Sequence, residues 1–579
     1  MQIELKVKNW QSYVPILGVI RRYQREDLQH DLLAGLILGV VTIPQAIAYA
    51  FLAGLPPEAG LYASLAPAVL YAVLGSSRQM VVGPVAITAL MVAAAVGEYA
   101  PLHGFSYLEV TAVLSLQAGI ILWLLRLSQM GGLVNLLSHP VITGFVNAAA
   151  ILIVVSQLPA LTGIGSGNAS DPFHQLLTMA AHLRELNPAV VLIGAAALIV
   201  LLLVRDYGVP MLRRFRRDVS DEHPISRIGP MLVTVLAAAA VVLWNLDTAY
   251  GVAVIGHLPS GLPEVTRPPF DWAMWLDVAP ASAMIALVAY VESYSIGATL
   301  ATRQRTRINS HQELIALGAA NVSAAFTGGY PVAGSFSRSS VNYEAGARSQ
   351  VSALICVLLI VLALLLLTPA FERLPHAALA AIVVVSVIGL IDVRSLRRHW
   401  RIHREDSITE LATLITVLLV GVEAGLLTGV ALSIAFFIRT SSRPHIVIVG
   451  RIPNTEHFRS ARRYDVETFP HVAAIRIDEN IYFGNANQIE NKLLKIIQRR
   501  PGTRHVLLVM NAVNMIDVSG LEMLYRLNQN LESLGIKLHL SEVKGPVMSQ
   551  LEVTDFTMRL TGSVFFTTDQ AMRDLAERT

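Results

Sequence analysis

The sequence places one carboxylate and one guanidinium inside stretches that are otherwise apolar. Glu292 lies in ALVAYVESYSIG, and Arg338 lies in GGYPVAGSFSRSSV. A charged side chain within a bilayer costs at least about 2.5 kcal/mol on insertion scales, so such residues mark transport routes or buried pairs. An acid can carry a proton, and an arginine beside a broken helix can hold an anion. Together they predict coupled transport of an anion.

The composition indicates a polytopic membrane protein. Hydrophobic residues make up 54% of the chain and charged residues 15%, with a mean hydropathy of +0.55, whereas soluble domains carry about 25% charge. We expect a polar N-terminal segment over 1–30, with no signal-peptide pattern. A transmembrane domain is expected over 31–440 and a soluble domain over 441–579. The single cysteine, Cys356, excludes disulfides within the chain.

About fourteen hydrophobic segments follow one another, several of them shorter than the usual 20-residue span. With the N-terminus inside, the arginine-rich loops fall on one side of the membrane, as the positive-inside rule requires, and both termini are cytoplasmic. The expected segments are 31–53, 61–75, 81–96, 107–127, 133–158, 188–204, 228–247, 277–301, 311–326, 331–346, 350–371, 374–391, 407–422 and 424–440.

An internal repeat relates the two halves, about 31–247 and 277–440. Pro84-Val-Ala recurs at Pro331-Val-Ala, and LSHP at 137–140 resembles LPHA at 374–377. Seven segments per repeat is an odd number, so the halves must be inverted in the membrane. In such folds, paired broken helices meet at the midplane and form the binding site. Segments 3 and 10 are the expected broken helices.

The physics of a broken helix suits an anion. A helix that begins after Pro84 or Pro331 directs unpaired N–H groups and the positive end of its dipole at the membrane centre. Proline at the helix start removes no N–H group that the helix needs. Gly334 allows close approach of a ligand, while Ser335 and Ser337 offer hydroxyl donors. The alternative is that small residues merely allow close helix packing.

Longer motifs resemble those of the SulP/SLC26 anion transporters. They are IPQA at 43–46 with Tyr49, LAGLPP at 52–57, GLY at 60–62, Gly83-Pro84, Glu292-Ser293 and GSFSRS at 334–339. The resemblance covers nearly the whole chain. It implies fourteen helices, in which a core (segments 1–4 and 8–11) moves against a gate (5–7 and 12–14) in an elevator-type mechanism. It also implies that the anion is bound by Gln45, Tyr49, Val85, Ala86, Gly334, Ser335, Phe336, Ser337 and Arg338.

Glu292 is the expected proton-coupling residue, because proton-coupled members resemble this chain in carrying a glutamate there. A divalent anion beside Arg338 and ionised Glu292 leaves a net negative charge, which protonation of Glu292 reduces. Anion and proton then favour each other's binding, which is symport. Two alternatives stay open: Glu292 as a structural partner of Arg338, and Arg338 as a lock for the half-helix.

The C-terminal region alternates strands and helices and resembles a STAS domain in an α/β fold. Ser519 precedes a helix where related antagonists carry a phosphorylatable serine, so it is a possible regulatory phosphosite. Ser519-x-x-Glu522 also reads as a capping box. Expected strands are 445–449, 472–477, 505–510 and 537–540, with helices over 486–499 and 520–534.

The combined prediction is H⁺-coupled sulfate symport in a bacterial inner (plasma) membrane, with no cofactor besides H⁺ and no metal. Alternatives are bicarbonate, nitrate or dicarboxylate transport, anion exchange, a STAS-signalling receptor, or an anion channel. Nothing resembles an enzyme's nucleophile with its base or an ATP site. Expected partners are a small inorganic anion, membrane lipid, a second copy in a homodimer, and acyl carrier protein or a kinase at the STAS domain. No nucleic-acid partner is expected.

Overall fold

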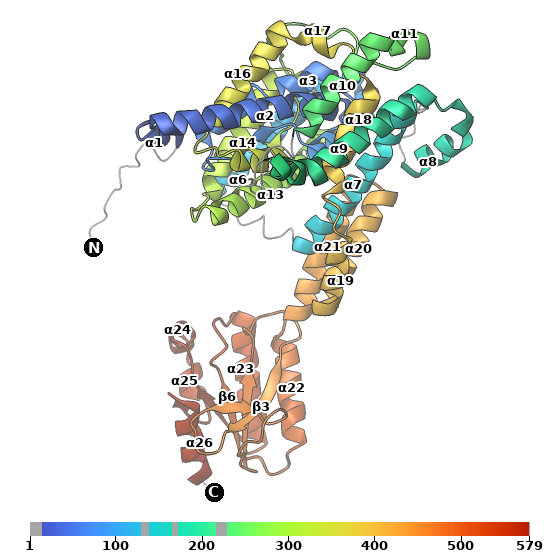
Figure 1. Cartoon of the computed structure of the whole chain (residues 1–579). Coiled ribbons are helices and arrows are strands. Elements are labelled where there is room, and N and C mark those ends of the chain that lie inside the picture. Colours follow the sequence, from blue (N-terminus) through green and yellow to red (C-terminus); the bar gives the residue numbers. More distant parts are fainter. Residues whose placement is uncertain (1–13, 129–137, 165–171, 216–227, 578–579) are drawn as a thin grey trace. The chain divides into compact units, whose positions relative to one another are not determined.

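The chain folds into two compact units, Met1–Ser433 and Ile434–Thr579 (Figure 1). The computed structural model describes residues 14–128, 138–164, 172–215 and 228–577. Part of the expected N-terminal segment, 1–13, and the start of the expected segment 133–158 lie outside these residues.

Each expected hydrophobic segment of the first unit contains a helix. Among the described residues, nine helical stretches are long and apolar enough to cross a membrane. The helices that correspond to the fourteen segments are α2 (Arg25–Leu52), α3 with α4 (Pro57–Tyr62 and Ala66–Leu74), α5 (Ala86–His103), α6 (Tyr107–Leu127), α7 (His139–Thr162), α9 (Pro188–Phe215), α10 (Gly229–Trp244), α13 (Ala279–Arg303), α14 (Ser310–Phe326), α15 (Phe336–Glu344), α16 (Val351–Leu366), α18 (His376–Ile388), α20 (Arg404–Leu419) and α21 (Val422–Ser441).

Short helices precede these segments or lie between them. They are α1 (Ile16–Ile20), α8 (Pro172–Ala181), α11 (Leu246–Tyr250), α12 (Trp272–Asp277), α17 (Thr368–Phe371) and α19 (Val393–Ile402).

The helices of the first unit pack in two groups. In the core group (α2–α6 and α13–α16), α14 packs against α6 and α4, and α16 packs against α2. In the gate group (α7, α9, α10 and α18–α21), α7 packs against α20, α18 and α9. Each group contains helices from both halves of the sequence, as expected for an inverted repeat.

Two short strands join the broken segments of the halves. β1 (Val82–Gly83) pairs antiparallel with β2 (Ala333–Gly334). Helix α5 begins directly after β1 and helix α15 directly after β2, so both half-helices start from one strand pair. This pairing positions their N-termini side by side at the centre of the unit.

The expected proline at the start of each half-helix is wrong. Pro84 lies between β1 and α5, two residues before the first helical residue, whereas Pro331 lies before β2. The shared Pro-Val-Ala therefore does not align equivalent positions of the two halves. The N-caps are Val85 and Ser335 instead. The physical reason is that the residues after Pro331 extend to pair with β1 before the chain turns into helix.

The second unit is a six-stranded mixed sheet with helices on both faces. The strand order is β4-β3-β5-β6-β7-β8, in which β3 is antiparallel to its neighbours and β5 to β8 are parallel. Helices α22, α23 and α24 cover one hydrophobic face and α26 the other. The bounds are β3 Ile446–Arg451, β4 Phe458–Ser460, β5 Val472–Ile477, α22 Ala486–Gln498, β6 His505–Val509, α23 Val518–Ser533, β7 Lys537–Ser541, α24 Gly545–Val553, α25 Phe556–Arg559, β8 Val564–Phe565 and α26 Thr568–Glu577.

The expected capping box at Ser519 is wrong. Helix α23 already begins at Val518, and its N-cap is Asp517, whose carboxylate accepts a hydrogen bond from Gly520 N at 2.8 Å. The other carboxylate oxygen accepts from Phe483 N at 2.8 Å. Aspartate is at least as good a cap as serine, and here it also ties α23 to the loop between β5 and α22. Ser519 lies within the first turn, half-buried.

A test of the cap compares Asp517→Ala with Ser519→Ala in the full-length chain. Loss of an N-cap costs about 1 kcal/mol, so amides of α23 should exchange about fivefold faster in Asp517→Ala. Ser519→Ala should leave exchange unchanged, because Ser519 caps nothing. Hydrogen-exchange mass spectrometry of residues 518–533 measures both variants. Faster exchange in Ser519→Ala alone would restore Ser519 as the cap.

Candidate functional site

A cavity of about 300 Å³ lies between the core and gate groups. Helices α2, α5, α13 and α15 of the core group line one side, and α9, α10 and α18 of the gate group line the other. Of the ten residues that the sequence assigned to the anion and the proton, eight line this cavity: Gln45, Tyr49, Val85, Ala86, Glu292, Ser335, Phe336 and Ser337. Gly334 and Arg338 do not.

The starts of α5 and α15 reach the cavity from opposite halves of the chain. Val85 caps α5 without a side-chain bond, so the first N–H groups of that helix lack a side-chain acceptor. Ser335 caps α15, and its hydroxyl accepts from Arg338 N at 3.4 Å. Thr88 donates to Val85 O at 3.0 Å, and thus bonds its own backbone. Two helix N-termini facing one cavity favour an anion there.

Helix α2 supplies two polar side chains, one turn apart. Gln45 and Tyr49 are 3% and 5% exposed, so both are buried at the cavity wall. The Gln45 Oε1 atom is buried without a hydrogen-bond partner in the part of the chain that is described. A buried amide oxygen of this kind costs free energy unless a ligand or water satisfies the group. This orphaned atom is therefore consistent with an occupant of the cavity.

Glu292 lies in the cavity wall on α13 without an ion-pair partner among the described residues. Its side chain is half-buried, its Oε2 atom has no hydrogen-bond partner, and no ion pair within 4.0 Å involves it among the described residues. A direct ion pair between Glu292 and Arg338 is thus not formed here, although the charge of the guanidinium still acts on the carboxylate. The neighbouring Ser293 accepts a hydrogen bond from Gly334 N at 2.7 Å and fixes α13 against β2.

Arg338 lies behind the cavity wall. Its side chain is fully buried, and Nη2 donates a hydrogen bond to the Pro84 carbonyl oxygen, which precedes the other half-helix. A Cβ built on Gly83 would lie 2.9 Å from Arg338 Nη1, so a larger residue there would displace the buried guanidinium. Arg338 therefore links the two half-helix starts. Its charge acts on the cavity from the second layer rather than by lining it.

The structure adds residues that could not be singled out from the sequence. Arg205 of α9 and Ser386 of α18, both from the gate group, line the cavity. In the sequence Arg205 belongs to an arginine-rich stretch that marks a membrane side, so nothing separates it from its neighbours. Ser386 lies in a uniformly apolar run. Only the packing of the gate group against the core brings them to the cavity.

Comparison with known proteins decides the family. Residues 28–413 match the sulfate permease family, and residues 463–572 match the STAS domain. The chain belongs to the sulfate permease family. It is 35% identical over 545 residues to "Probable sulfate transporter 4.2" of Arabidopsis thaliana, covering 92% of this chain and 79% of that protein. A probable sulfate transporter of Mycobacterium tuberculosis is 32% identical, covering 98% of this chain and 99% of the relative.

Solved structures show the same fold. Murine Solute Carrier 26 family member A9, an anion transporter in the inward-facing state, aligns with a TM-score of 0.90 at 24% identity, covering 100% of this chain and 96% of that chain. The transmembrane domain of the cyanobacterium bicarbonate transporter BicA aligns with a TM-score of 0.60 at 19% identity, covering 70% of this chain and 98% of that chain. The protein is a multi-pass anion transporter with a C-terminal STAS domain, from a family of transporters rather than enzymes.

The link between the half-helices can be tested without removing a charge. Gly83→Ala should displace the Arg338 guanidinium, at a cost of about 1–3 kcal/mol typical of overpacking. We expect a lower thermal midpoint and weaker anion uptake. Gly97→Ala is the matched control, since Gly97 lies in α5 with open space around its Cβ position. Thermal unfolding and uptake at limiting anion measure both variants. Equal thermal midpoints and equal uptake in the two variants would show that the contact between Gly83 and Arg338 is not needed.

Proposed function

We propose that the protein imports sulfate together with H⁺ by elevator-type alternating access. The observation that carries the proposal is the position of Glu292. Its uncompensated carboxylate oxygen shares one cavity with the starts of α5 and α15. The same cavity thus offers an anion-binding surface and a protonatable group, which is what coupling requires.

Charge arithmetic gives the direction of coupling. Each helix N-terminus presents roughly half a positive charge, and Arg338 adds one charge from behind the wall, so together they balance at most a divalent anion. With Glu292 ionised, the occupied cavity would hold excess negative charge in a poorly hydrated space, which is costly. Protonation of Glu292 removes one negative charge. Each ligand then raises the affinity for the other by the same factor.

Sulfate is the favoured anion because the aligned relatives with 30–35% identity are named sulfate transporters. Bicarbonate, nitrate or dicarboxylate transport, or anion exchange, is the alternative. The backbone N–H groups of two helix starts would accept any small oxyanion, so the alternative differs from the proposal in substrate and coupling, not in fold.

The position of the site residues within one helix group supports the elevator mechanism. Gln45, Glu292 and both half-helix starts belong to the core group, and the strand pair with Arg338 ties the half-helices together. Movement of the core group against the gate group would carry these residues as one body. The gate group lines the opposite wall and would stay behind.

Arg205 is proposed to attract the anion at the mouth of the cavity. It is 44% exposed, belongs to the gate group, and forms an ion pair with the adjacent Asp206 at 2.8 Å. A partly exposed cation at an opening raises the local concentration of anions. Because Arg205 is not on the core group, it would serve only the conformation in which this mouth is open.

The remaining assignments are also proposals. The arginine distribution supports cytoplasmic termini, and a bacterial inner membrane remains a prediction. A homodimer, regulation through Ser519 and a protein partner of the STAS domain remain predictions from the resemblance.

Glu292→Gln tests the coupling role. The amide cannot release a proton, so uptake of radiolabelled sulfate driven by an inward proton gradient should fall to background in proteoliposomes. Sulfate binding by the detergent-purified variant should persist, because the half-helix starts are intact. Gradient-driven uptake at the wild-type rate would exclude Glu292 as the coupling group.

Arg205→Gln and Asp206→Asn form a pair with opposite expected effects. Loss of the cation should weaken apparent sulfate affinity from the side of this mouth by about twofold to fivefold, the range for partly exposed ion pairs. Loss of the neighbouring carboxylate should strengthen it by a similar factor. Both effects should shrink as salt is added. Initial-rate measurements give these affinities, and a shift of the same sign in both variants would contradict the steering role.

A further inference from the structure

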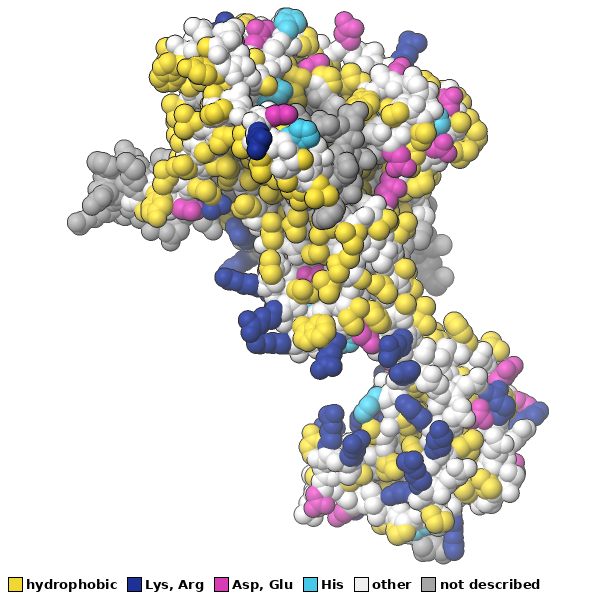
Figure 2. Space-filling view, turned by 90° about the vertical axis from the view of Figure 1, so that its right-hand side faces the viewer, with side chains coloured by type: hydrophobic (Ala, Val, Ile, Leu, Met, Phe, Trp, Pro, Cys, Tyr) yellow, Lys and Arg dark blue, Asp and Glu magenta, His cyan; other side chains and the backbone are white. Residues whose placement is uncertain are grey.

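Helix α19 carries an arginine stripe that the transport mechanism does not use. The segment from Val393 to Arg404 contains five arginines and no acidic residue, and it lies between two membrane segments, α18 and α20. The arginines are Arg394, Arg397, Arg398, Arg401 and Arg404, and all are exposed. Figure 2 shows Lys and Arg side chains gathered below the hydrophobic surface of the first unit.

Most of this charge is not neutralised by the protein. Arg398 pairs with Asp392 at 3.4 Å. The other four arginines have no ion-pair partner within 4.0 Å among the described residues. Such a concentration of unpaired guanidinium groups is unfavourable by mutual repulsion, and it invites an anionic ligand of matching geometry.

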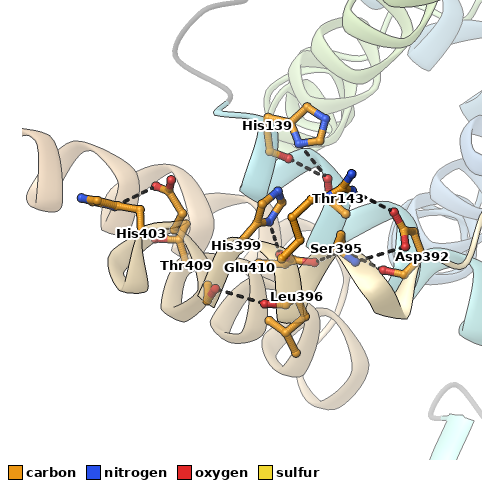
Figure 3. Close-up of polar contacts among 12 residues, drawn as sticks. His139, Thr143, Asp392, Ser395, Leu396, His399, His403, Thr409 and Glu410 are labelled. Carbon is orange, nitrogen blue, oxygen red and sulfur yellow. Dashed lines mark hydrogen bonds and ion pairs between the residues drawn. The ribbon is translucent and has the colours of Figure 1, made fainter. Parts of the chain in front are cut away.

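The arginine stripe faces one fixed direction because the opposite face of α19 is hydrogen-bonded to α20. Ser395 Oγ and His399 Nδ1 contact the two carboxylate oxygens of Glu410 at 2.6 and 2.7 Å, and Glu410 is 1% exposed. Figure 3 shows these side chains turned from α19 toward α20, with His139 of α7 nearby. The His399 and His139 rings meet edge to face at a centroid distance of 5.8 Å.

Hydrogen bonds of Asp392 also fix the start of α19. Asp392 caps the helix by accepting from Arg394 N and Ser395 N at 3.0 and 3.1 Å, and its own N–H donates to Asn147 Oδ1 at 2.7 Å. The corner between α18 and α19 is therefore pinned to α7. With the buried face fixed on α20 and α7, the outward face of α19 cannot turn away from its surroundings.

The outward face combines the stripe with apolar side chains. At about 100° per residue, Arg394, Arg397 and Arg401 fall within one sector, while Val393 and Trp400 fall together on its flank. Val393 is 74% exposed and Trp400 is 52% exposed. A helix with basic residues beside tryptophan and aliphatic residues is suited to the boundary between headgroups and acyl chains.

We propose that this face of α19 binds the phosphate headgroups of anionic phospholipids. The arginines would bind the phosphates, and Val393 and Trp400 would enter the adjoining apolar layer. A soluble polyanion would match the charge but would leave these two side chains in water. The position of α19 between two membrane segments therefore favours lipid. The binding does not depend on which anion the cavity transports.

The test uses the purified full-length chain in detergent, titrated with phosphatidylglycerol or, separately, phosphatidylcholine. Phosphatidylglycerol should raise the thermal midpoint more than phosphatidylcholine. Each basic residue at an anionic surface contributes about a fivefold factor in affinity. The triple variant Arg394→Gln, Arg397→Gln and Arg401→Gln should therefore raise the half-saturating concentration of phosphatidylglycerol about 100-fold. The matched control removes three exposed arginines of the STAS domain, Arg459, Arg462 and Arg463, and should keep the wild-type response.

A wild-type response in the α19 variant would overturn the proposal, and so would an equal stabilisation by inorganic phosphate at the same concentration. A second readout guards against a variant that fails to fold. Brominated phosphatidylglycerol should quench the tryptophan fluorescence of the wild type more than that of Trp400→Phe, with a smaller difference for brominated phosphatidylcholine. No difference between the two proteins would place Trp400 away from the lipid and overturn the proposal.

Discussion

The antiparallel pairing of β1 with β2 is the constraint on which the site depends. It brings together two half-helices that lie some 250 residues apart in the chain. Ser335 N donates to Val81 O at 2.9 Å, and Val81 N donates to Ser339 Oγ at 3.0 Å, so one backbone bond and one side-chain bond extend the strand pair. Arg338 completes the link through Pro84. Two helix dipoles that would repel one another at their positive ends are thereby held at one cavity.

This arrangement explains how the proposed anion site can be built with few charged side chains. Backbone N–H groups at the helix starts need no side-chain charge, and their direction is set by the strand pair rather than by flexible residues. The buried guanidinium satisfies a carbonyl outside either helix, so it stabilises the link while its positive charge stays close behind the cavity wall. Glu292 is the carboxylate that lines the cavity, its Oε2 atom has no hydrogen-bond partner among the described residues, and the proposed coupling rests on this group.

The sequence predicts the helices well because long apolar runs and proline or glycine breaks are local signals. The four expected strands of the second unit are also present, and β5 begins and ends at the expected residues, whereas the short edge strands β4 and β8 were not expected. Other features depend on distant contacts. Pro331 and Pro84 look equivalent but are not, because strand pairing decides where each helix begins. Asp517 displaces Ser519 as a cap through its second bond to Phe483 N. Arg205 reaches the cavity only through packing of the two helix groups.

The most direct test of the account is the number of protons taken up when sulfate binds. Calorimetric titration of the purified protein in two buffers with different ionisation enthalpies measures it near neutral pH. The account predicts uptake approaching about one proton per sulfate in the wild type and none in Glu292→Gln. Sulfate binding without proton uptake in the wild type, or equal uptake in both proteins, would contradict it.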